Sequence, residues 1–168
     1  MPVTTRLILD DFLPFRLSYT SNLVSDSIAR AYAALFGLTI PEWRLVTVVA
    51  ETGGITQNAI GQRTRMDKVT VSRAAAALVD RGLLERQASA SDRRSHLLVL
   101  SDAGRTLYSA VAPKALDLER RIFTAFSPDE LAGFVAMLRR IDTEVLALDN
   151  ASGDQDSHDG AGDHSARR

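Results

Sequence analysis

The chain has 168 residues, and its 45% hydrophobic and 24% charged content is typical of a folded globular domain rather than a disordered chain. It contains no cysteine, which excludes disulfides, thiolate nucleophiles, zinc-thiolate sites and oxidant sensing through cysteine. No apolar run reaches the length of a membrane span, and residues 1–9 lack the features of a secretion signal, so we expect a cytoplasmic protein.

The net charge of −1 conceals an uneven distribution of charge along the chain. Residues 56–105 contain nine basic and five acidic side chains, an excess of four positive charges, whereas five aspartates and two arginines follow residue 148. A basic segment inside a neutral chain is typical of a nucleic-acid-binding surface, because phosphates are contacted by cations.

A long first helix is predicted between residues 10 and 36. Apolar residues keep helical spacing as far as Gly37, and Asp10 or Asp11 is the expected cap, with Pro14 tolerated in the first turn. Polar residues are interleaved among the apolar ones, so one side of this helix faces something other than a hydrophobic core.

A second helix is predicted to open at Thr39, because Thr39 and Glu42 have the spacing of a capping box. This helix contains Trp43 and stops before the glycine pair at residues 53 and 54. We expect it to support the segment that follows.

Residues 56–82 predict a helix-turn-helix. Thr56 is expected to cap a short helix that runs to about Gln62, and Asp67 to cap a second helix that ends at Gly82. The second helix has one apolar face, formed by Val71, Ala74, Ala75, Leu78 and Val79.

A β-hairpin is predicted next, with strands at residues 83–87 and 96–100 joined by a polar connection at residues 88–95. The connection contains Asp92, Arg93 and Arg94. Two adjacent arginines are suited to entering a narrow minor groove or to gripping phosphates, since each guanidinium offers several fixed donors and a permanent charge.

Two more helices are predicted after the hairpin. Ser101 is the expected cap of the first, in which Pro113 predicts a kink near Ala110. Ser127 and Glu130 have the start signal of the second. Helices at both ends of the chain carry more apolar surface than a small lobe can bury, which favours an obligate dimer.

This order of elements, with LVDRGLLER followed by SASDRRSHLLVLSDAGR, resembles the winged helix-turn-helix of the MarR family of bacterial transcriptional regulators. The wing of that family carries an Asp-x-Arg signature, a Leu-rich strand and a Ser or Thr that opens the next helix. The matching positions here are Asp92, Arg94, residues 97–100 and Ser101.

The resemblance implies a mainly α fold with a small β-hairpin wing, and it covers roughly residues 10–148 in element order. We therefore expect a flexible N-terminus at residues 1–9, a single domain at residues 10–148 and a disordered acidic tail at residues 149–168. Within the domain, the winged helix-turn-helix is expected at about residues 38–104, and dimerisation helices at about residues 10–36 and 101–148.

Double-stranded DNA is the partner that the second helix of the helix-turn-helix and the wing predict. Base edges in the major groove are expected to meet Lys68, Thr70, Ser72 and Arg73. Arg93 and Arg94 are expected to meet the minor groove or phosphates. Phosphates alone are expected to meet Gln57, Gln62, Arg63 and Arg65. The alternative is a solvated helix face and a surface turn.

A small-molecule effector is implied by the resemblance, because members of that family commonly bind aromatic or phenolic anions between the dimer lobe and the wing domain. The residues expected at such a pocket are Arg16, Tyr19, Asn22 and Trp43, with Arg16 pairing with an aromatic acid or its coenzyme A thioester. The alternatives are that Tyr19 and Trp43 are core residues and that Arg16 bridges the dimer.

No catalytic residue, metal site or cofactor is expected, because His96, His158 and His164 lie in no metal-ligand or nucleophile arrangement. The sequence therefore predicts a homodimeric regulator, acting as a repressor on an inverted-repeat operator and released by a small molecule. The alternatives are an architectural DNA-binding protein without an effector and a winged-helix module for protein contacts.

Overall fold

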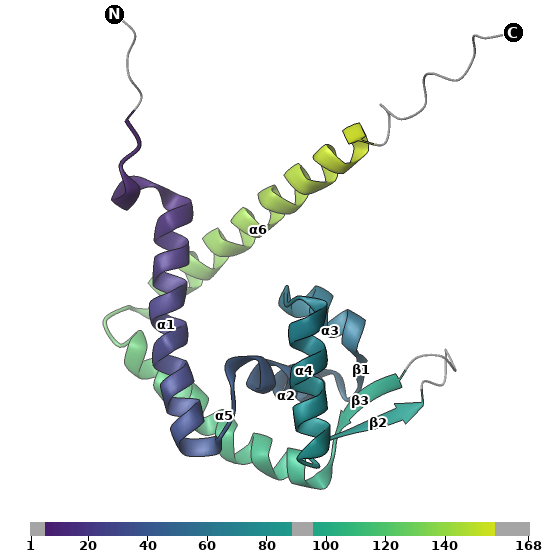
Figure 1. Cartoon of the computed structure of the whole chain (residues 1–168). Helices are drawn as coiled ribbons and strands as arrows, with labels where there is room; N and C mark the ends of the chain where they lie inside the picture. Colours follow the sequence, from purple (N-terminus) through teal and green to yellow (C-terminus); the bar gives the residue numbers. More distant parts are fainter. Residues whose placement is uncertain (1–5, 89–95, 157–168) are drawn as a thin grey trace, which may run out of the picture. The chain divides into compact units, whose positions relative to one another are not determined.

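The computed structural model describes residues 6–88 and 96–156 of the chain (Figure 1). One compact unit runs to Ile122 and a second begins at Phe123. The first unit contains all the strands and most of the helices, and the second consists of the helix α6 (Pro128–Asp156) and the residues that lead into it.

The first unit begins with the short 3-10 helix η1 (Leu9–Asp11) and continues with α1 (Leu13–Phe36) and α2 (Ile40–Thr52). Then come the two-residue strand β1 (Ile55–Thr56), α3 (Gln57–Thr64) and α4 (Lys68–Asp80). The strands β2 (Leu84–Ala88) and β3 (His96–Leu100) and the helix α5 (Asp102–Ile122) complete it. The predicted fold class, mainly helical with a small β wing, is confirmed.

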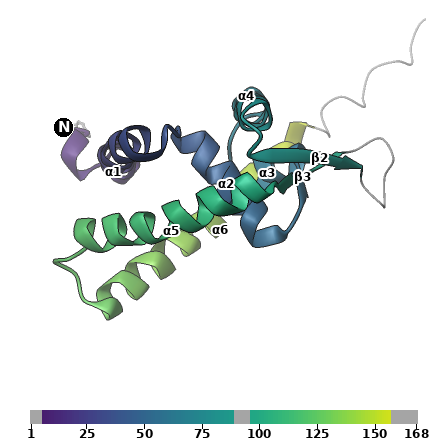
Figure 2. The ribbon, with the colours of Figure 1, turned by 90° about the horizontal axis from the view of Figure 1, so that it is seen from below.

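The sheet is antiparallel, with β3 between β1 and β2. Leu84 pairs with Leu100, and Ala88 pairs with His96, which places the hairpin connection at residues 89–95, outside the described residues. In Figure 2 the view runs nearly along α4, which lies beside β2. The strand β1 was not predicted, because two residues are too short to show an alternating pattern.

The hydrophobic core lies where α2, α3, α4, the sheet and α5 meet. Its largest fully buried side chains are Leu38, Leu45, Val46, Val49, Ile60, Val71, Leu78, Leu84, Leu98 and Val111. The apolar face predicted for α4 is confirmed, since Val71, Ala74, Ala75 and Leu78 are buried and Val79 is half-buried against the core. The helices α3 and α4 are therefore fixed to α2 by their buried side chains.

Side chains cap the starts of most helices as predicted. The side chain of Thr39 accepts from the backbone N–H of Glu42 at 3.3 Å, and the Glu42 carboxylate accepts from the N–H of Thr39 at 2.8 Å. Thr56 accepts from the N–H of Ala59, and Ser127 forms the same reciprocal arrangement with Glu130.

The predicted cap of α1 is wrong. Asp10 and Asp11 lie inside η1, and Phe12 stands at the N-cap without a side-chain hydrogen bond. Asp10 is instead 3.2 Å from the guanidinium of Arg16. Pro14 does lie in the first turn, where its missing N–H leaves no hydrogen bond unmade.

Two predicted helix ends are also corrected. The helix α3 continues to Thr64 rather than Gln62, and α6 continues to Asp156. Residues 149–156 are therefore helical, although they were predicted to belong to the tail. They contain no proline, and extending an existing helix adds one hydrogen bond for each residue that is fixed.

Among the described residues, no single helix has both the length and the apolar composition needed to cross a membrane. The helices α1 and α2 meet that test only as a pair, and the pair is bent by 79°.

Candidate nucleic-acid interface

The start of α4 is fixed by Asp67. Its carboxylate accepts hydrogen bonds from the backbone N–H of Thr70 at 2.8 Å and from the Thr70 hydroxyl at 2.6 Å. Both bonds favour the charged form, so the hydroxyl of Thr70 and then its N–H hold the pKa of Asp67 below its usual value. Thr70, predicted to read bases, thus has its hydroxyl proton engaged within the helix cap.

The outer face of α4 is polar and exposed. Lys68, Ser72 and Arg73 are exposed, while Val71 and Ala74 on the opposite face are buried. Because residues four apart share one helix face, Ser72 lies one turn beyond Lys68, and the exposed Arg73 lies one turn beyond Val69. Three of the four predicted major-groove residues are therefore free to meet a ligand outside the chain.

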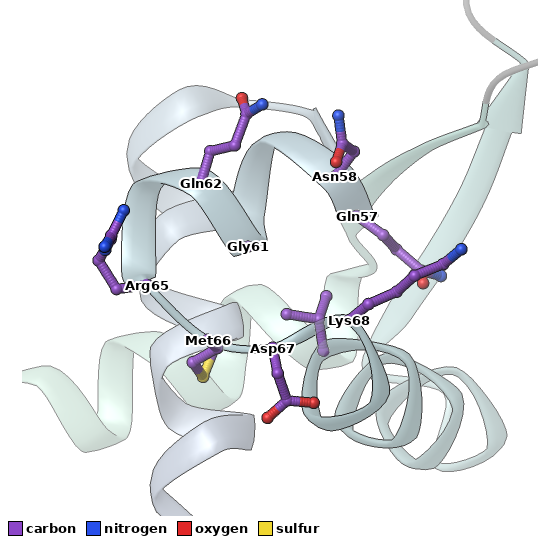
Figure 3. A pocket seen from close by; sticks show the side chains of 9 residues that line it. Gln57, Asn58, Gly61, Gln62, Arg65, Met66, Asp67 and Lys68 are labelled. Carbon is purple, nitrogen blue, oxygen red and sulfur yellow. The ribbon is translucent and has the colours of Figure 1, made fainter. Parts of the chain in front are cut away.

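A groove of about 630 Å³ lies between α3 and the start of α4 (Figure 3). Its polar lining comes from Gln57, Asn58, Gln62, Arg65, Asp67 and Lys68. Figure 3 shows Gln57 and Lys68 on one side of the groove and Arg65 at its other end. Three predicted phosphate contacts, Gln57, Gln62 and Arg65, thus lie together with one predicted base contact, Lys68.

The two helices come close at Gly61. A Cβ atom at this position would lie 3.2 Å from the carbonyl oxygen of Met66, in the turn between the helices. Arg65 has φ of 55°, the only positive value at a non-glycine among the described residues. A left-handed residue reverses the chain direction between α3 and α4, which lets the two helices pack closely.

Arg63 does not face the groove with the other predicted phosphate contacts. Its guanidinium lies 2.7 Å from the carboxylate of Glu51 on α2. This ion pair joins the two helices, and both of its side chains remain about half exposed.

The wing contributes two strands to the interface. Arg93 and Arg94, the predicted wing contacts, lie outside the described residues. On β2, Arg86 and Gln87 are exposed. The sequence interpretation passed over both because they were counted only as strand residues.

Val69 is a third residue that the sequence interpretation missed. It is 57% exposed and lies on α4 between Lys68 and Thr70, away from the buried face. A signal was available, because an apolar residue at this position falls outside the spacing of the stripe from Val71 to Leu78.

The four predicted effector-pocket residues divide into two groups. Arg16 lies over the ring of Tyr19, 5.5 Å from its centroid, and Asn22 is exposed on the same helix. Trp43 instead packs between Tyr32, at 5.5 Å between ring centroids, and Tyr108, at 5.9 Å. A helix rises about 1.5 Å per residue, so Tyr32 and Tyr19 are about 20 Å apart along α1.

The aromatic group around Trp43 joins three helices of the first unit. Burial raises the pKa of Tyr32, a hydrogen bond with Trp43 opposes that rise, and the negative charge of Glu119 adds to it. Trp43 thus packs between α1 and α5, with Tyr32 on one side and Tyr108 on the other.

A smaller hollow of about 310 Å³ lies beside this aromatic group, between α2, β3 and α5. Its lining combines a cation, an aromatic ring and aliphatic side chains, and consists of Val49, Ala50, Gly53, Val99, Leu100, Arg105, Tyr108 and Ser109. Arg105 is held by the carbonyl oxygen of Leu100 at 2.6 Å.

A capped helix with an exposed basic face, packed on a scaffold helix and flanked by a β-hairpin, defines a winged helix-turn-helix DNA-binding protein. Residues 36–95 match the sequence model of the MarR family. The chain belongs to the MarR family, whose members are transcription regulators that bind DNA and dimerise. The family is one of regulators rather than enzymes.

Several known proteins are similar to this chain. A probable transcriptional regulator from Pseudomonas aeruginosa is 31% identical, with a TM-score of 0.68 over 80% of this chain and 99% of that one. The transcriptional regulator HosA of Escherichia coli O157:H7 is 26% identical over 71% of this chain and 88% of its own length. CouR from Rhodococcus jostii RHA1, solved bound to p-coumaroyl-CoA, is 22% identical and has a TM-score of 0.72 over 81% of this chain and 95% of that one.

Proposed function

We propose that this protein is a homodimeric repressor that binds an inverted-repeat operator and is released by a small aromatic acid or its coenzyme A thioester. The exposed face of α4 carries the proposal. Lys68, Ser72 and Arg73 project from a helix whose start is fixed by Asp67 and whose other face is buried. Such a helix is held rigidly enough to present side chains to base edges in a major groove.

The remaining contacts position the protein on the DNA. Gln57, Gln62 and Arg65 line the groove beside α4, where the DNA backbone would pass. Arg93 and Arg94 are proposed to reach the minor groove or its phosphates from the wing. A regulator of this kind acts where the chromosome lies, so the cytoplasmic location remains part of the proposal.

A homodimer is supported by the apolar side chains that the described chain leaves exposed at both of its ends. Near the N-terminus these are Leu7, Ile8, Leu9, Phe12 and Leu13, and on α6 they are Phe134, Val135, Met137, Ile141 and Val145. Large exposed apolar surfaces mark interaction sites, because monomeric proteins rarely leave them in water. A second copy of the chain, in which both ends take part, would cover them.

Footprinting tests the dimer together with operator recognition. A symmetric dimer presents two copies of α4, so it should protect two half-sites about one helical turn, or 10 base pairs, apart. Protection of a single half-site by a monomer would contradict the dimer.

The salt dependence of binding tests the wing. Replacing Arg93 or Arg94 by alanine should flatten the slope of log affinity against log salt by about one unit for each lost phosphate contact. The preferred sequence should change little. An altered base preference at one major-groove position, with an unchanged slope, would show that these arginines read bases instead.

The effector class is supported by the ligand of CouR and by the cationic and aromatic side chains of this chain. Tyr19 lies about 20 Å along α1 from Tyr32, which packs against Trp43, so Arg16 and Tyr19 form a group separate from Trp43 within one chain. Arg105 and Tyr108 offer the same chemistry within one subunit.

A ligand screen shows which of the two candidate sites, the one at Arg16 or the one at Arg105, binds the effector. Aromatic acids and acyl-CoA thioesters are tested for thermal stabilisation of the protein, and each ligand found is tested for release of DNA. A hundredfold release requires about 2.7 kcal/mol of differential affinity. Arg16→Ala should abolish the response if the ligand pairs with α1, and Arg105→Ala if it binds beside Tyr108.

An architectural DNA-binding protein would give a different set of results. It would bind unrelated DNA about as tightly as any selected sequence and would respond to no ligand in the screen. The exposed Lys68, Ser72 and Arg73 favour the regulator, because polar side chains at the start of a groove-binding helix discriminate between base pairs.

A further inference from the structure

Val69 is an apolar residue on the exposed face of α4, where no other described part of the fold packs against it. It is 57% exposed, and among the described residues it belongs neither to the buried core nor to the hydrophobic side chains packed against it. A single exposed hydrophobic residue elsewhere on a surface would need no explanation. Val69 lies directly beside Lys68, at the beginning of α4.

The helix itself gains nothing from a valine at this position. Valine has a lower helix propensity than alanine, because its branched Cβ restricts the side chain against the preceding turn. The side chain is also outside the stripe formed by Val71, Ala74 and Leu78. Neither helix stability nor core packing therefore accounts for it.

The side chain of Val69 lies on the same exposed face of α4 as the residues proposed to contact DNA. Residues three and four apart share one face of a helix, so Val69, Ser72 and Arg73 form a single exposed row. This row points away from the core and begins beside the groove lined by Lys68 and Gln57. A helix that enters the major groove by its first turns brings Val69 to the base edges.

The major groove offers one apolar group, the C5-methyl of thymine, and small apolar side chains are its usual partners. We propose that Val69 selects thymine at one position of each half-site by packing its methyl groups against that C5-methyl. Both apolar surfaces then leave water, which favours thymine over bases that present only hydrogen-bonding groups there. This proposal rests on the proposed DNA-binding function of α4 and adds a specificity residue to it.

The test uses the full chain and a DNA site obtained by in vitro selection with the unaltered protein. Each thymine of the half-site is replaced in turn, in both halves, by deoxyuridine, which lacks only the C5-methyl. At one position the dissociation constant of the unaltered protein should rise about three- to fivefold per half-site, the size expected for one methyl group. In the Val69→Ala protein the penalty for deoxyuridine at that position should be clearly smaller, because alanine presents one methyl group closer to the backbone.

Two further variants complete the test. Asp80→Ala changes an exposed residue at the far end of the same helix, leaves Val69 in place and should keep the full penalty for deoxyuridine. Val69→Thr keeps the branched shape but replaces one methyl by a hydroxyl, so its penalty should be smaller than that of the unaltered protein. Because Val69 is exposed, circular dichroism should show all three variants folded.

The outcomes distinguish this inference from the function on which it rests. If the protein binds a selected site but no thymine-to-deoxyuridine replacement weakens binding, the inference is overturned and the regulator stands. The same holds if the penalty is identical in the unaltered protein and in Val69→Ala. If selection enriches no sequence, both the operator-binding function and the role of Val69 are overturned.

Discussion

The guanidinium of Arg81, at the end of α4, lies 3.6 Å from the carboxylate of Glu42, near the start of α2. The same guanidinium donates a hydrogen bond of 3.0 Å to the carbonyl oxygen of Gly37, at the end of α1. Glu42 also accepts from the backbone N–H of Thr39. One buried carboxylate thus caps the scaffold helix and holds the far end of the proposed recognition helix.

Replacing Glu42 by alanine should destabilise the protein by about 2 kcal/mol, because it removes a helix cap worth about 1 kcal/mol and leaves Arg81 without its anion. Glu42→Gln should cost less, since glutamine can keep the capping bond. Urea denaturation measures the free energy of unfolding of both variants.

The ion pair between Glu42 and Arg81 is expected to contribute about 1 kcal/mol at most, because Arg81 is partly exposed, and a double-mutant cycle with Arg81→Ala measures that coupling. Equal losses in Glu42→Gln and Glu42→Ala would show that the charge, rather than the cap, is what matters.

A second relationship fixes the wing to α5. A Cβ atom at Gly104 would lie 2.0 Å from the carbonyl oxygen of Leu83, a backbone atom that cannot rotate away. The Ser101 hydroxyl donates to the carbonyl oxygen of Gly82 at 2.6 Å and accepts from the N–H of Gly104 at 2.9 Å. The backbone at the end of α4 and the start of β2 is therefore in direct van der Waals contact with the backbone at the start of α5.

Gly104→Ala should reduce the free energy of unfolding by about 3 kcal/mol, since the clash forces backbone elements apart. Gly133→Ala is the matched control, because nothing lies within 4 Å of a Cβ atom at that helical position. It should stabilise α6 by about 0.5 to 1 kcal/mol through helix propensity. Guanidinium denaturation compares the two, and an unchanged stability in Gly104→Ala would show that β2 and α5 separate more easily than their hydrogen bonds indicate.

Local signals explain how much of this fold the sequence predicted. The capping residues Thr39, Thr56, Asp67 and Ser127 act on backbone groups three residues away, so their roles can be recognised without any knowledge of tertiary structure. The buried face of α4 follows from spacing alone.

Contacts between distant parts of the chain could not be predicted in this way. The ion pair between Arg63 and Glu51 joins two helices, and no spacing rule indicates it. The same is true of the stacking of Trp43 on Tyr108, which lies 65 residues further along the chain in sequence number. Both contacts depend on how the helices pack, which local spacing does not encode.

The cap of α4 should depend on pH. The pKa of Asp67 is lower in the folded protein than its ordinary value of about 3.9, because the charged carboxylate accepts hydrogen bonds from Thr70. A lowered folded pKa means that the contribution to stability is fully present above about pH 4 and is lost as the pH falls through the folded value.

The difference in urea midpoint between the unaltered protein and Asp67→Ala should therefore be largest near pH 7 and shrink below pH 4. Asp67→Ser provides a neutral cap as the control, and its advantage over Asp67→Ala should stay the same across this range. A constant difference between the unaltered protein and Asp67→Ala down to pH 2 would show that the charge of Asp67 contributes nothing to the cap.

Arg65 has a strained backbone and also lines the groove between α3 and α4. Its φ of 55° is a left-handed conformation that costs a non-glycine residue about 1 kcal/mol, and glycine adopts it without that cost. Arg65→Gly should therefore be about 1 kcal/mol more stable than Arg65→Ala, although both lose the same cation. Urea denaturation of the two variants measures the difference.

The salt dependence of DNA binding should differ between variants of Arg65 and variants of Arg63. If Arg65 contacts a phosphate, both of its variants should flatten the salt slope by about one unit. Arg63→Ala should leave that slope nearly unchanged, because the charge of Arg63 is already paired with Glu51. Fluorescence-anisotropy titrations at several salt concentrations give the slopes. A flatter slope in Arg63→Ala and an unchanged slope in the Arg65 variants would reverse the two assignments, and would mean that the ion pair with Glu51 opens when DNA binds.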